Sequence, residues 1–341
     1  MKAADFHALL AIEHLDACLT EVDETLDLSM LGTGELVEPS RRMLRAGGKR
    51  LRPLLTIASA VASDPTMSMR PLDMRVRRGA AAVELVHVGS LVHDDIMDEA
   101  LSRRGVPTVN SVEGSNQALL VGDFMLARAG VEAARVSADV AMSLAVTISD
   151  LCDGQSLEGN YQGQPTRTVD DAIESIKGKT GALMRAACDI GALAVGRTDL
   201  ADAFGSYGMN FGIAFQLIDD LLDLLSTEEL MGKPVNNDVR AGVYTVPALF
   251  AVQEATGTAR DRLLTAMLAA PTDAAAAAEF HATVLASSAV EATMGLVNRY
   301  NELARNALEV VPASRTRDGL LEVPQRYLDG IIAEKVPPQR R

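Results

Sequence analysis

The sequence predicts an all-α protein that folds as a single large helical bundle. Apolar residues recur at the spacing of a helix along nearly the whole chain, and the alternation typical of a strand is nowhere sustained. Aromatic residues make up only 4% of the chain, whereas alanine, leucine and valine are abundant, which favours helix-on-helix packing over a sandwich or barrel. No repeat of solenoid period is visible, so we expect residues 1–341 to form one domain.

The periodicity predicts long helices separated by turns. Glycine, proline, serine and asparagine punctuate the pattern, with breaks expected near 32–34, 63–71, 103–107, 159–168, 231–237 and 271–272. The alanine-rich run at 273–279 is most simply a strong helix former. The expected helices cover roughly 3–27, 53–62, 72–98, 115–130, 131–160, 170–195, 199–226, 241–256, 259–270, 273–311 and 317–334.

Composition and charge exclude several classes of protein. The chain carries 46 acidic against 32 basic residues, a net charge of −14, which argues against nucleic-acid binding because that needs clustered lysine and arginine. Apolar residues make up 48% and charged residues 23%, the usage of a globular protein with a large core. Disorder is therefore not expected.

The cysteines and the N-terminus indicate the compartment. Cys18, Cys152 and Cys188 are odd in number and lack a C-x-x-C spacing, so neither a disulfide framework nor a zinc site is indicated, which fits a reducing cytoplasm. Acidic residues interrupt the apolar N-terminal stretch, so we do not expect a signal peptide. No uninterrupted apolar run reaches roughly 18 residues, so no ordinary membrane span is expected either.

The pattern D-D-x-x-D occurs twice, and it carries the chemistry. Its outer carboxylates are four residues apart, so in a helix they lie on one face, about 6 Å apart along the axis. Like charges at that spacing repel, and aspartate is a poor residue inside a helix, so each motif destabilises the fold unless a cation lies between the carboxylates. The six aspartates are Asp94, Asp95 and Asp98 in the first motif and Asp219, Asp220 and Asp223 in the second.

An acidic solvated face is the simplest alternative for a single cluster of this kind. The second motif, however, lies in a helix that is apolar nearly all round, from Phe211 to Leu225, and an unpartnered carboxylate there would cost several kcal/mol or become neutral. Two matching clusters favour a metal role. Hard oxygen ligands without cysteine or a second histidine nearby select magnesium, which often binds through carboxylates and substrate phosphates.

Cationic residues that could bind phosphate accompany the acidic motifs. Any one of them is more often a solvated side chain, and GGK alone is weak evidence, but a glycine-rich loop before a helix also supplies free backbone N–H groups. The G-x-x-x-x-G-K-[ST] spacing of an ATPase loop is absent. The candidates are Lys49, Arg50 and Arg52 in GGKRLRP, Arg103 and Arg104 in SRRGVP, Lys179 beside Thr180 in GKT, and Lys233 in GKPVNND.

Together these motifs resemble the trans-isoprenyl diphosphate synthase (polyprenyl synthetase) family. The resemblance runs in the expected order from about residue 40 to 250, through GGKRLRP, HDDIMD, GDFMLARA, GKT and FQLIDDLLD followed by GKPVNND. It implies an all-α isoprenoid-synthase fold, with the two acidic motifs facing each other across a central cavity and usually a homodimer. It also implies a Mg²⁺-dependent head-to-tail condensation of isopentenyl diphosphate with an allylic diphosphate.

The same resemblance implies a role for each site residue. Asp94, Asp98 and Asp219 would be the main ligands of about three Mg²⁺ ions, with Asp95, Asp220 and Asp223 holding them directly or through water. Thr180 and Gln216 would line the reacting carbons. The diphosphate-binding residues would be Arg103, Lys179 and Lys233 for the allylic substrate, and Lys49, Arg52, His87 and Arg104 for isopentenyl diphosphate.

Two positions depart from the family pattern. Val243 stands where G-K-x-T-x-P would place a diphosphate-binding lysine, so that contact is either lost or replaced by another cation. In GQSLE, at 154–158, the glutamine and glutamate are exchanged relative to many members, although the same atoms could still serve. The remaining histidines, His7, His14, His93 and His281, are expected to be structural or exposed.

Small residues before the first motif predict a long product. Ser90 and Gly89 lie four and five residues before Asp94 and are expected to line the product tunnel, where short-chain members usually carry an aromatic residue. We therefore expect a product of at least about twenty carbons, more in keeping with about thirty to fifty.

Two alternative functions stay open at this point. A class I terpene cyclase shares the fold and the first motif, but usually carries an N-S-E-type second site and lacks GGKR-x-R-P. A non-catalytic subunit of a heteromeric prenyl synthase commonly loses one acidic motif, whereas both are intact here.

Overall fold

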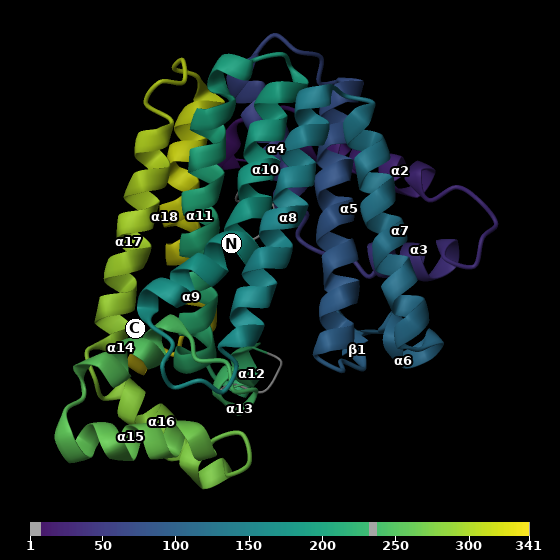
Figure 1. Cartoon of the computed structure of the whole chain (residues 1–341). Coiled ribbons are helices and arrows are strands. Elements are labelled where there is room, and N and C mark those ends of the chain that lie inside the picture. The colour runs from purple at the N-terminus through teal and green to yellow at the C-terminus, as the bar shows by residue number, and fades with distance from the viewer. Residues whose placement is uncertain (1–7, 232–236, 341) are drawn as a thin grey trace.

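The computed structural model of the protein describes residues 8–231 and 237–340. Its long helices run side by side as a bundle, and α15 and α16 lie across one end (Figure 1). The helices are α2 (Leu15–Ser29), α3 (Val37–Arg45), α4 (Leu51–Ser63), α5 (Met74–Met97), α6 (Val109–Glu113), α7 (Ser115–Ala134), α8 (Ala138–Asn160), α9 (Val169–Ile176), α10 (Ala182–Ala194), α11 (Thr198–Leu225), α12 (Glu228–Met231), α13 (Asn237–Arg240), α14 (Val246–Glu254), α15 (Gly257–Ala269), α16 (Ala274–Leu285), α17 (Ala289–Ala307) and α18 (Arg315–Lys335).

Four short elements accompany the helices in the described chain. Strands β1 (Ser102–Arg103) and β2 (Val106–Pro107) pair antiparallel, with Arg103 opposite Val106. A π-helical turn, η1 (Lys177–Gly181), joins α9 to α10, and a 3₁₀ turn, η2 (Pro338–Arg340), follows α18. The predicted all-α class is confirmed.

Helix α10 forms the centre of the bundle because its residues are small and apolar. It contacts α4, α5, α8 and α11 and is buried on nearly every side. A Cβ on Gly208 of α11 would lie 2.8 Å from the backbone carbon of Met184, and one on Gly191 would lie 2.8 Å from Cβ of Ser59. The helix backbones therefore approach so closely that only glycine fits at these crossings.

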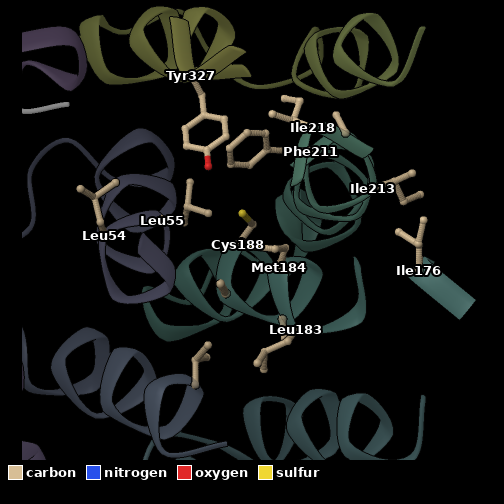
Figure 2. Close-up of a cluster of buried hydrophobic side chains, with 14 of the residues drawn as sticks. Leu54, Leu55, Ile176, Leu183, Met184, Cys188, Phe211, Ile213, Ile218 and Tyr327 are labelled. Carbon is tan, nitrogen blue, oxygen red and sulfur yellow. The ribbon is translucent and has the colours of Figure 1, made fainter. Parts of the chain in front are cut away.

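Aromatic and aliphatic side chains fill the space around this centre. Figure 2 shows Leu55 of α4, Met184 of α10, Phe211 of α11 and Tyr327 of α18 converging from four helices. The rings of Phe211 and Tyr327 are 6.1 Å apart and edge-to-face, a geometry that aromatic pairs prefer. This core connects α11, which carries the second acidic motif, to the rest of the bundle.

Most predicted helices are present, but two expected helices are interrupted. Residues 3–27 were expected as one helix, whereas α2 begins at Leu15, after left-handed backbone at Ala11 and His14. That break lets both Leu10 and Ile12 be buried, which a continuous helix would place on different faces. The expected helix 273–311 is two helices, α16 and α17, bent by 63°.

The bend between α16 and α17 coincides with hydrogen bonds made by Ser287 and Ser288. The backbone N–H and hydroxyl of Ser288 both donate to Glu254 of α14, at 3.0 and 2.8 Å. Ser287 also donates to the carbonyl of Val284, at 2.7 Å. These side-chain bonds compete with helical hydrogen bonds and end α16. The helical segments α3, α6, α12 and α13 and the β1–β2 hairpin were not predicted.

The described helices are short or too polar to cross a bilayer singly. None of these helices has by itself the length and apolar composition to cross a bilayer, although α16 and α17 meet that test as a bent pair.

Replacing Gly208 with alanine is expected to destabilise the bundle. The new Cβ would collide with the backbone of Met184, so α10 and α11 would have to separate, at a cost of about 1–3 kcal/mol. Gly295→Ala in α17 is the matched control, because nothing lies within 4 Å of its added Cβ, and it is expected to gain about 0.5–1 kcal/mol. Denaturant unfolding measures both. Equal stability of the two variants would contradict the close crossing.

Asp189 of α10 is expected to make stability depend on pH. The hydroxyl of Ser143 contacts both of its carboxyl oxygens at 3.0 Å, and burial raises the pKa of Asp189 to about 7. Between its ordinary pKa and about 7 the folded state therefore holds one more proton than the unfolded state. The contribution of Asp189 to the free energy of unfolding therefore falls as the pH rises through that window, by up to about 1.4 kcal/mol per pH unit.

The Asp189→Asn variant isolates this effect because its amide does not titrate. The difference in unfolding free energy between wild type and variant should favour the wild type progressively more from pH 7.5 to 5. A difference that is constant across this range would show that the Asp189 carboxyl is not protonated in the fold.

Candidate active site

The two acidic motifs lie at the ends of two long helices. Asp94 and Asp95 occupy the last turn of α5 and Asp98 is its C-cap, while the second motif lies in the last two turns of α11. In Figure 1 the elements that follow these helices, β1 and α12, both lie at the lower end of the bundle. The fold thus brings motifs that are far apart in sequence to the same end.

One cavity joins the two motifs. It has a volume of about 550 Å³ and is lined by Asp98 of the first motif and Asp220 of the second, and we call it the acidic cavity. Lys179, Thr180 and Gln216 line it as well. The structure therefore brings together residues that the sequence assigned to metal, diphosphate and reacting carbons.

A second cavity extends from the first motif into the bundle. Its volume is about 580 Å³, and it runs from Asp94 to a wall that includes Leu126, Ile148 and Leu151, so we call it the apolar cavity. Asp98 and Val243 line both cavities, which places the two side by side.

Of the two residues that were expected to line a product tunnel, the structure places one in a cavity wall. Ser90 lines the apolar cavity, as expected. Gly89 does not, because it faces α7, where an added Cβ would lie 3.2 Å from Cβ of Met125 and 3.3 Å from the carbonyl of Gly122. Gly89 is therefore a helix-packing residue, since consecutive helical positions lie about 100° apart around the axis.

In the first motif, Asp95 is paired and Asp94 faces the cavity. Asp95 is 1% exposed, and its Oδ1 accepts from Nε of Arg103 at 2.6 Å, while its buried Oδ2 has no hydrogen-bond partner. Burial raises the pKa of Asp95, and Arg103 opposes that shift. Burial also raises the pKa of Asp94, with Lys179 lowering it and Asp98 raising it further.

The π turn η1 positions Lys179. A Cβ on Gly178 would lie 2.7 Å from Cα of Gly154 in α8, so the two backbones touch. One turn further along α8, Glu158 accepts from Nζ of Lys179 at 2.6 Å. Burial opposes protonation of Lys179, but Glu158 and Asp94 outweigh it and raise its pKa. The ammonium is thus charged and lies between acidic groups of the cavity.

In the second motif, a hydrogen-bonded chain orients Asp220. The hydroxyl of Thr180 donates to Oε1 of Gln216 at 3.0 Å, and Nε2 of Gln216 donates to Oδ1 of Asp220 at 3.0 Å. Asp220 is 6% exposed, and burial, together with Asp238, raises its pKa well above the ordinary value.

The other two aspartates of this motif differ in their surroundings. Asp223 accepts from the backbone N–H groups of Asn237 and Asp238, at 3.3 and 3.4 Å, at the start of α13. Asp219 lies on the side toward α18, where its charge adds to the burial that raises the pKa of Tyr327.

A separate group of basic residues gathers around the GGKRLRP loop. Nη2 of Arg104 lies 3.4 Å from Nε2 of His87, and Nη1 donates to the carbonyl of Gly47. Burial lowers the pKa of Arg52 to about 10 and that of His87 well below its ordinary value, and Arg104 contributes to both shifts. Nε of Arg52 is buried without a hydrogen-bond partner. Because the positive charges of Arg52 and Arg104 repel each other, the cluster suits an anion.

Some predicted residues lie outside these groups. Lys49 is exposed, and Lys233 falls outside the described residues. Arg50 binds Glu84 at 2.6 Å and Asp23 at 2.9 Å, so it anchors the loop. Sequence reasoning missed Arg167, which lines the acidic cavity, because an arginine in the loop QPTRT carries no motif.

The carboxylates around the acidic cavity could supply part of the coordination of a hard divalent cation. Among the described residues no three histidine, cysteine or acidic side chains form a complete metal-binding group. The carboxylates of the cavity nevertheless supply the oxygen atoms that Mg²⁺ prefers, and Oδ2 of Asp95 has no other partner. Substrate oxygens and water would have to complete the coordination, which is how magnesium commonly binds beside phosphates.

Comparison with known proteins agrees with this geometry. A model of the polyprenyl synthetase family matches residues 33–284. The chain is 33% identical to heptaprenyl diphosphate synthase component 2 of Geobacillus stearothermophilus, over 89% of this chain and 92% of that protein. It is also 33% identical to nonaprenyl diphosphate synthase of Mycobacterium tuberculosis, over 87% of each.

Solved structures show the same likeness. A polyprenyl synthase from Caulobacter crescentus CB15, complexed with calcium and isoprenyl diphosphate, superposes with a TM-score of 0.85. It is 28% identical in sequence, and the match covers 96% of this chain and 97% of that one. The chain therefore belongs to the polyprenyl synthetase family of prenyltransferases.

Proposed function

We propose that the protein is a trans-polyprenyl diphosphate synthase that condenses isopentenyl diphosphate head-to-tail with an allylic diphosphate in a Mg²⁺-dependent reaction. The observation that carries this proposal is the acidic cavity, where Asp98 and Asp220 of the two motifs meet Lys179. The adjoining apolar cavity suits a hydrocarbon chain. The active form would be a homodimer in the cytoplasm, with residues 1–341 as one polyprenyl synthetase domain and about three Mg²⁺ ions per site.

The allylic diphosphate would lie in the acidic cavity. Magnesium, when bound, would neutralise the diphosphate and make it a better leaving group. Lys179 lies beside Asp94 and Glu158 and can donate to phosphate oxygens, and Arg103 can do so from its position on Asp95. With both residues held by carboxylates, the charge that stabilises the departing diphosphate is in place before the C–O bond breaks.

Isopentenyl diphosphate would bind to the basic cluster of Arg52, His87 and Arg104. Their pKa values are lowered by burial and mutual repulsion, so a diphosphate there would relieve an unfavourable arrangement. Lys49 would contribute from the exposed side of the loop. This second anion site favours a condensation between two diphosphates over a terpene cyclase, which would need only one.

The cation formed from the allylic carbon would face oriented dipoles. Because the hydroxyl hydrogen of Thr180 is donated to Gln216, the lone pairs of its oxygen are left for a positive carbon. The isopentenyl double bond attacks that carbon, and the released diphosphate can accept the proton. The apolar wall of Leu126, Ile148 and Leu151 keeps water from the cation.

The product is proposed to contain at least about twenty carbons, and about thirty to fifty fits better, since Ser90 leaves the apolar cavity open near the metals. The two curated relatives are named for heptaprenyl and nonaprenyl products. One of them is a component of a two-part enzyme, so a heteromer is the alternative assembly. Purified chain that condenses substrates unaided would support the homodimer.

Activity is expected to require a divalent cation and the Asp94 carboxylate. Chelation should abolish condensation and added Mg²⁺ should restore it, while Asp94→Asn should lower kcat at least about 100-fold because it removes a buried charge from the site. Asp261→Asn, at an exposed position of α15, is the control with the same charge change. Product formation from radiolabelled isopentenyl diphosphate measures each rate. Full activity of Asp94→Asn would refute the assigned site.

Ser90→Phe is expected to shorten the product. The new ring would enter the apolar cavity that Ser90 now lines, so the chain should stop at least about one five-carbon unit earlier. Ser90→Ala, which adds no bulk, should leave the product unchanged. Mass spectrometry of the extracted products decides the matter, and a wild-type product of fifteen carbons would already contradict an open tunnel.

A further inference from the structure

Arg167 is a buried guanidinium in the wall of the acidic cavity. It lies between α8 and α9, is 7% exposed, and shares the cavity with Lys179 and Asp220. The next residue, Thr168, is the N-cap of α9, where its backbone N–H donates to Asp171 at 2.9 Å and its hydroxyl accepts from the backbone of Asp171 at 3.1 Å. This reciprocal cap fixes the backbone from which Arg167 projects.

The guanidinium of Arg167 lies over the ring of Tyr161, with Cζ 6.0 Å from the ring centroid, and its hydrogen-bonding groups are only partly satisfied. Its Nη1 donates to the carbonyl of Tyr244 at 3.1 Å, and its buried Nε has no hydrogen-bond partner. Within the described part of the chain no carboxylate lies within 4.0 Å of it, whereas Arg103 is paired with Asp95 and Lys179 with Glu158. A buried charge without a close counterion is unfavourable, so an anion in the cavity would stabilise it.

The electrostatics of the cavity agree with this geometry. Burial lowers the pKa of Arg167, and the nearby charges of Glu158 and Asp220 act in the opposite direction. The group still remains a cation, because an arginine does not lose its proton in proteins. Because Nε is buried, the remaining N–H groups of Nη1 and Nη2 are the ones that can donate to phosphate oxygens as a fork.

The segment next to Arg167 supplies no cation of its own. Residues 241–245 are Ala-Gly-Val-Tyr-Thr, and Val243 lines the cavity where the family pattern places a lysine. Two hydrogen bonds of 2.8 Å join this segment to the loop that carries Arg167. Nε2 of Gln162 donates to the carbonyl of Ala241, and the backbone N–H of Gly163 donates to the carbonyl of Gly242. The bond from Arg167 to Tyr244 adds a third connection. These bonds place the guanidinium beside the neutral side chain of Val243.

We propose that Arg167 binds the diphosphate in the acidic cavity and supplies the positive charge that Val243 does not. This inference rests on the proposed function, since it takes the occupant of the cavity to be a prenyl diphosphate. Arg167 thereby becomes a substrate-binding residue outside the recognised motifs. The cation is delivered from the loop between α8 and α9 instead of from the segment before α14.

The proposal is tested by using calorimetry on the full chain to measure how tightly inorganic pyrophosphate binds in the presence of Mg²⁺. Arg167→Gln removes the charge but keeps an amide that can donate to Tyr244, and it should weaken binding about 10- to 100-fold, the usual effect of losing a charged hydrogen bond. Arg240→Gln makes the same change of charge at an exposed position of α13 and should bind like the wild type. Wild-type affinity in Arg167→Gln would overturn the proposal.

A lysine at position 243 separates binding from loop support. Arg167→Gln should also raise the KM for the allylic diphosphate, with little change in the KM for isopentenyl diphosphate. Adding Val243→Lys to Arg167→Gln should recover most of the lost affinity for pyrophosphate and lower the KM for the allylic diphosphate again. A purely structural Arg167 would instead give a lowered melting temperature and no recovery by Val243→Lys, and that result would overturn the proposal.

A second variant at position 167 and the wild-type protein itself complete the test. If Arg167→Gln does not fold, Arg167→Lys keeps the charge and the bond to Tyr244 but loses the fork, and it should weaken pyrophosphate binding about three-fold or more. Unchanged binding in that variant would overturn the proposal. If the wild-type protein neither binds pyrophosphate nor condenses the substrates, the proposed function itself is refuted. If the wild-type protein is active but substitution of Arg167 does not change pyrophosphate binding, only this inference is refuted.

Discussion

Negative charge held at the C-terminal ends of two buried helices is the constraint on which the site depends. Asp220 is buried and Asp94 is half-buried, and burial raises the pKa of each. Both lie in the last turns of their helices, where the helix dipole is also negative and adds to the cost. The fold alone therefore leaves these groups poorly stabilised. Cations beside these carboxylates would stabilise them, and the proposed diphosphate with its metal ions would bring cations and anion together.

The packing of the bundle is what maintains this unfavourable arrangement. Gly191 and Gly208 let α10 approach α4 and α11 at backbone contact, and Gly154 with Gly178 does the same between α8 and η1. Such crossings have little freedom to relax, because any shift opens voids or creates collisions. The carboxylates and Lys179 are thus held in position before a substrate arrives, so less reorganisation remains for the reaction.

Much of the fold and of the acidic motifs could be predicted from sequence, because both depend on local periodicity. The α5 helix was expected at 72–98 and runs from Met74 to Met97. What periodicity cannot show is how an element is rotated or interrupted by a distant partner. Gly89 was assigned to the tunnel but faces Met125 of α7, and the expected helix at 273–311 is broken by hydrogen bonds from Ser288 to Glu254 of α14. Arg167 could not be predicted as a cavity residue either, because only the folded loop between α8 and α9 places it in the cavity.

On the proposed function, the distribution of positive charge would let the site distinguish two diphosphates. Arg52, His87 and Arg104 form one basic cluster around the GGKRLRP loop, where no carboxylate of the acidic motifs binds them directly. Arg103 and Lys179 are instead paired with Asp95 and Glu158, so their net charge is partly cancelled. Under the proposed function, the first cluster would hold a diphosphate without a metal, whereas the acidic cavity would bind a diphosphate together with divalent ions. Ionisation would then be promoted at one substrate and not at the other, and this difference would set the direction of the condensation.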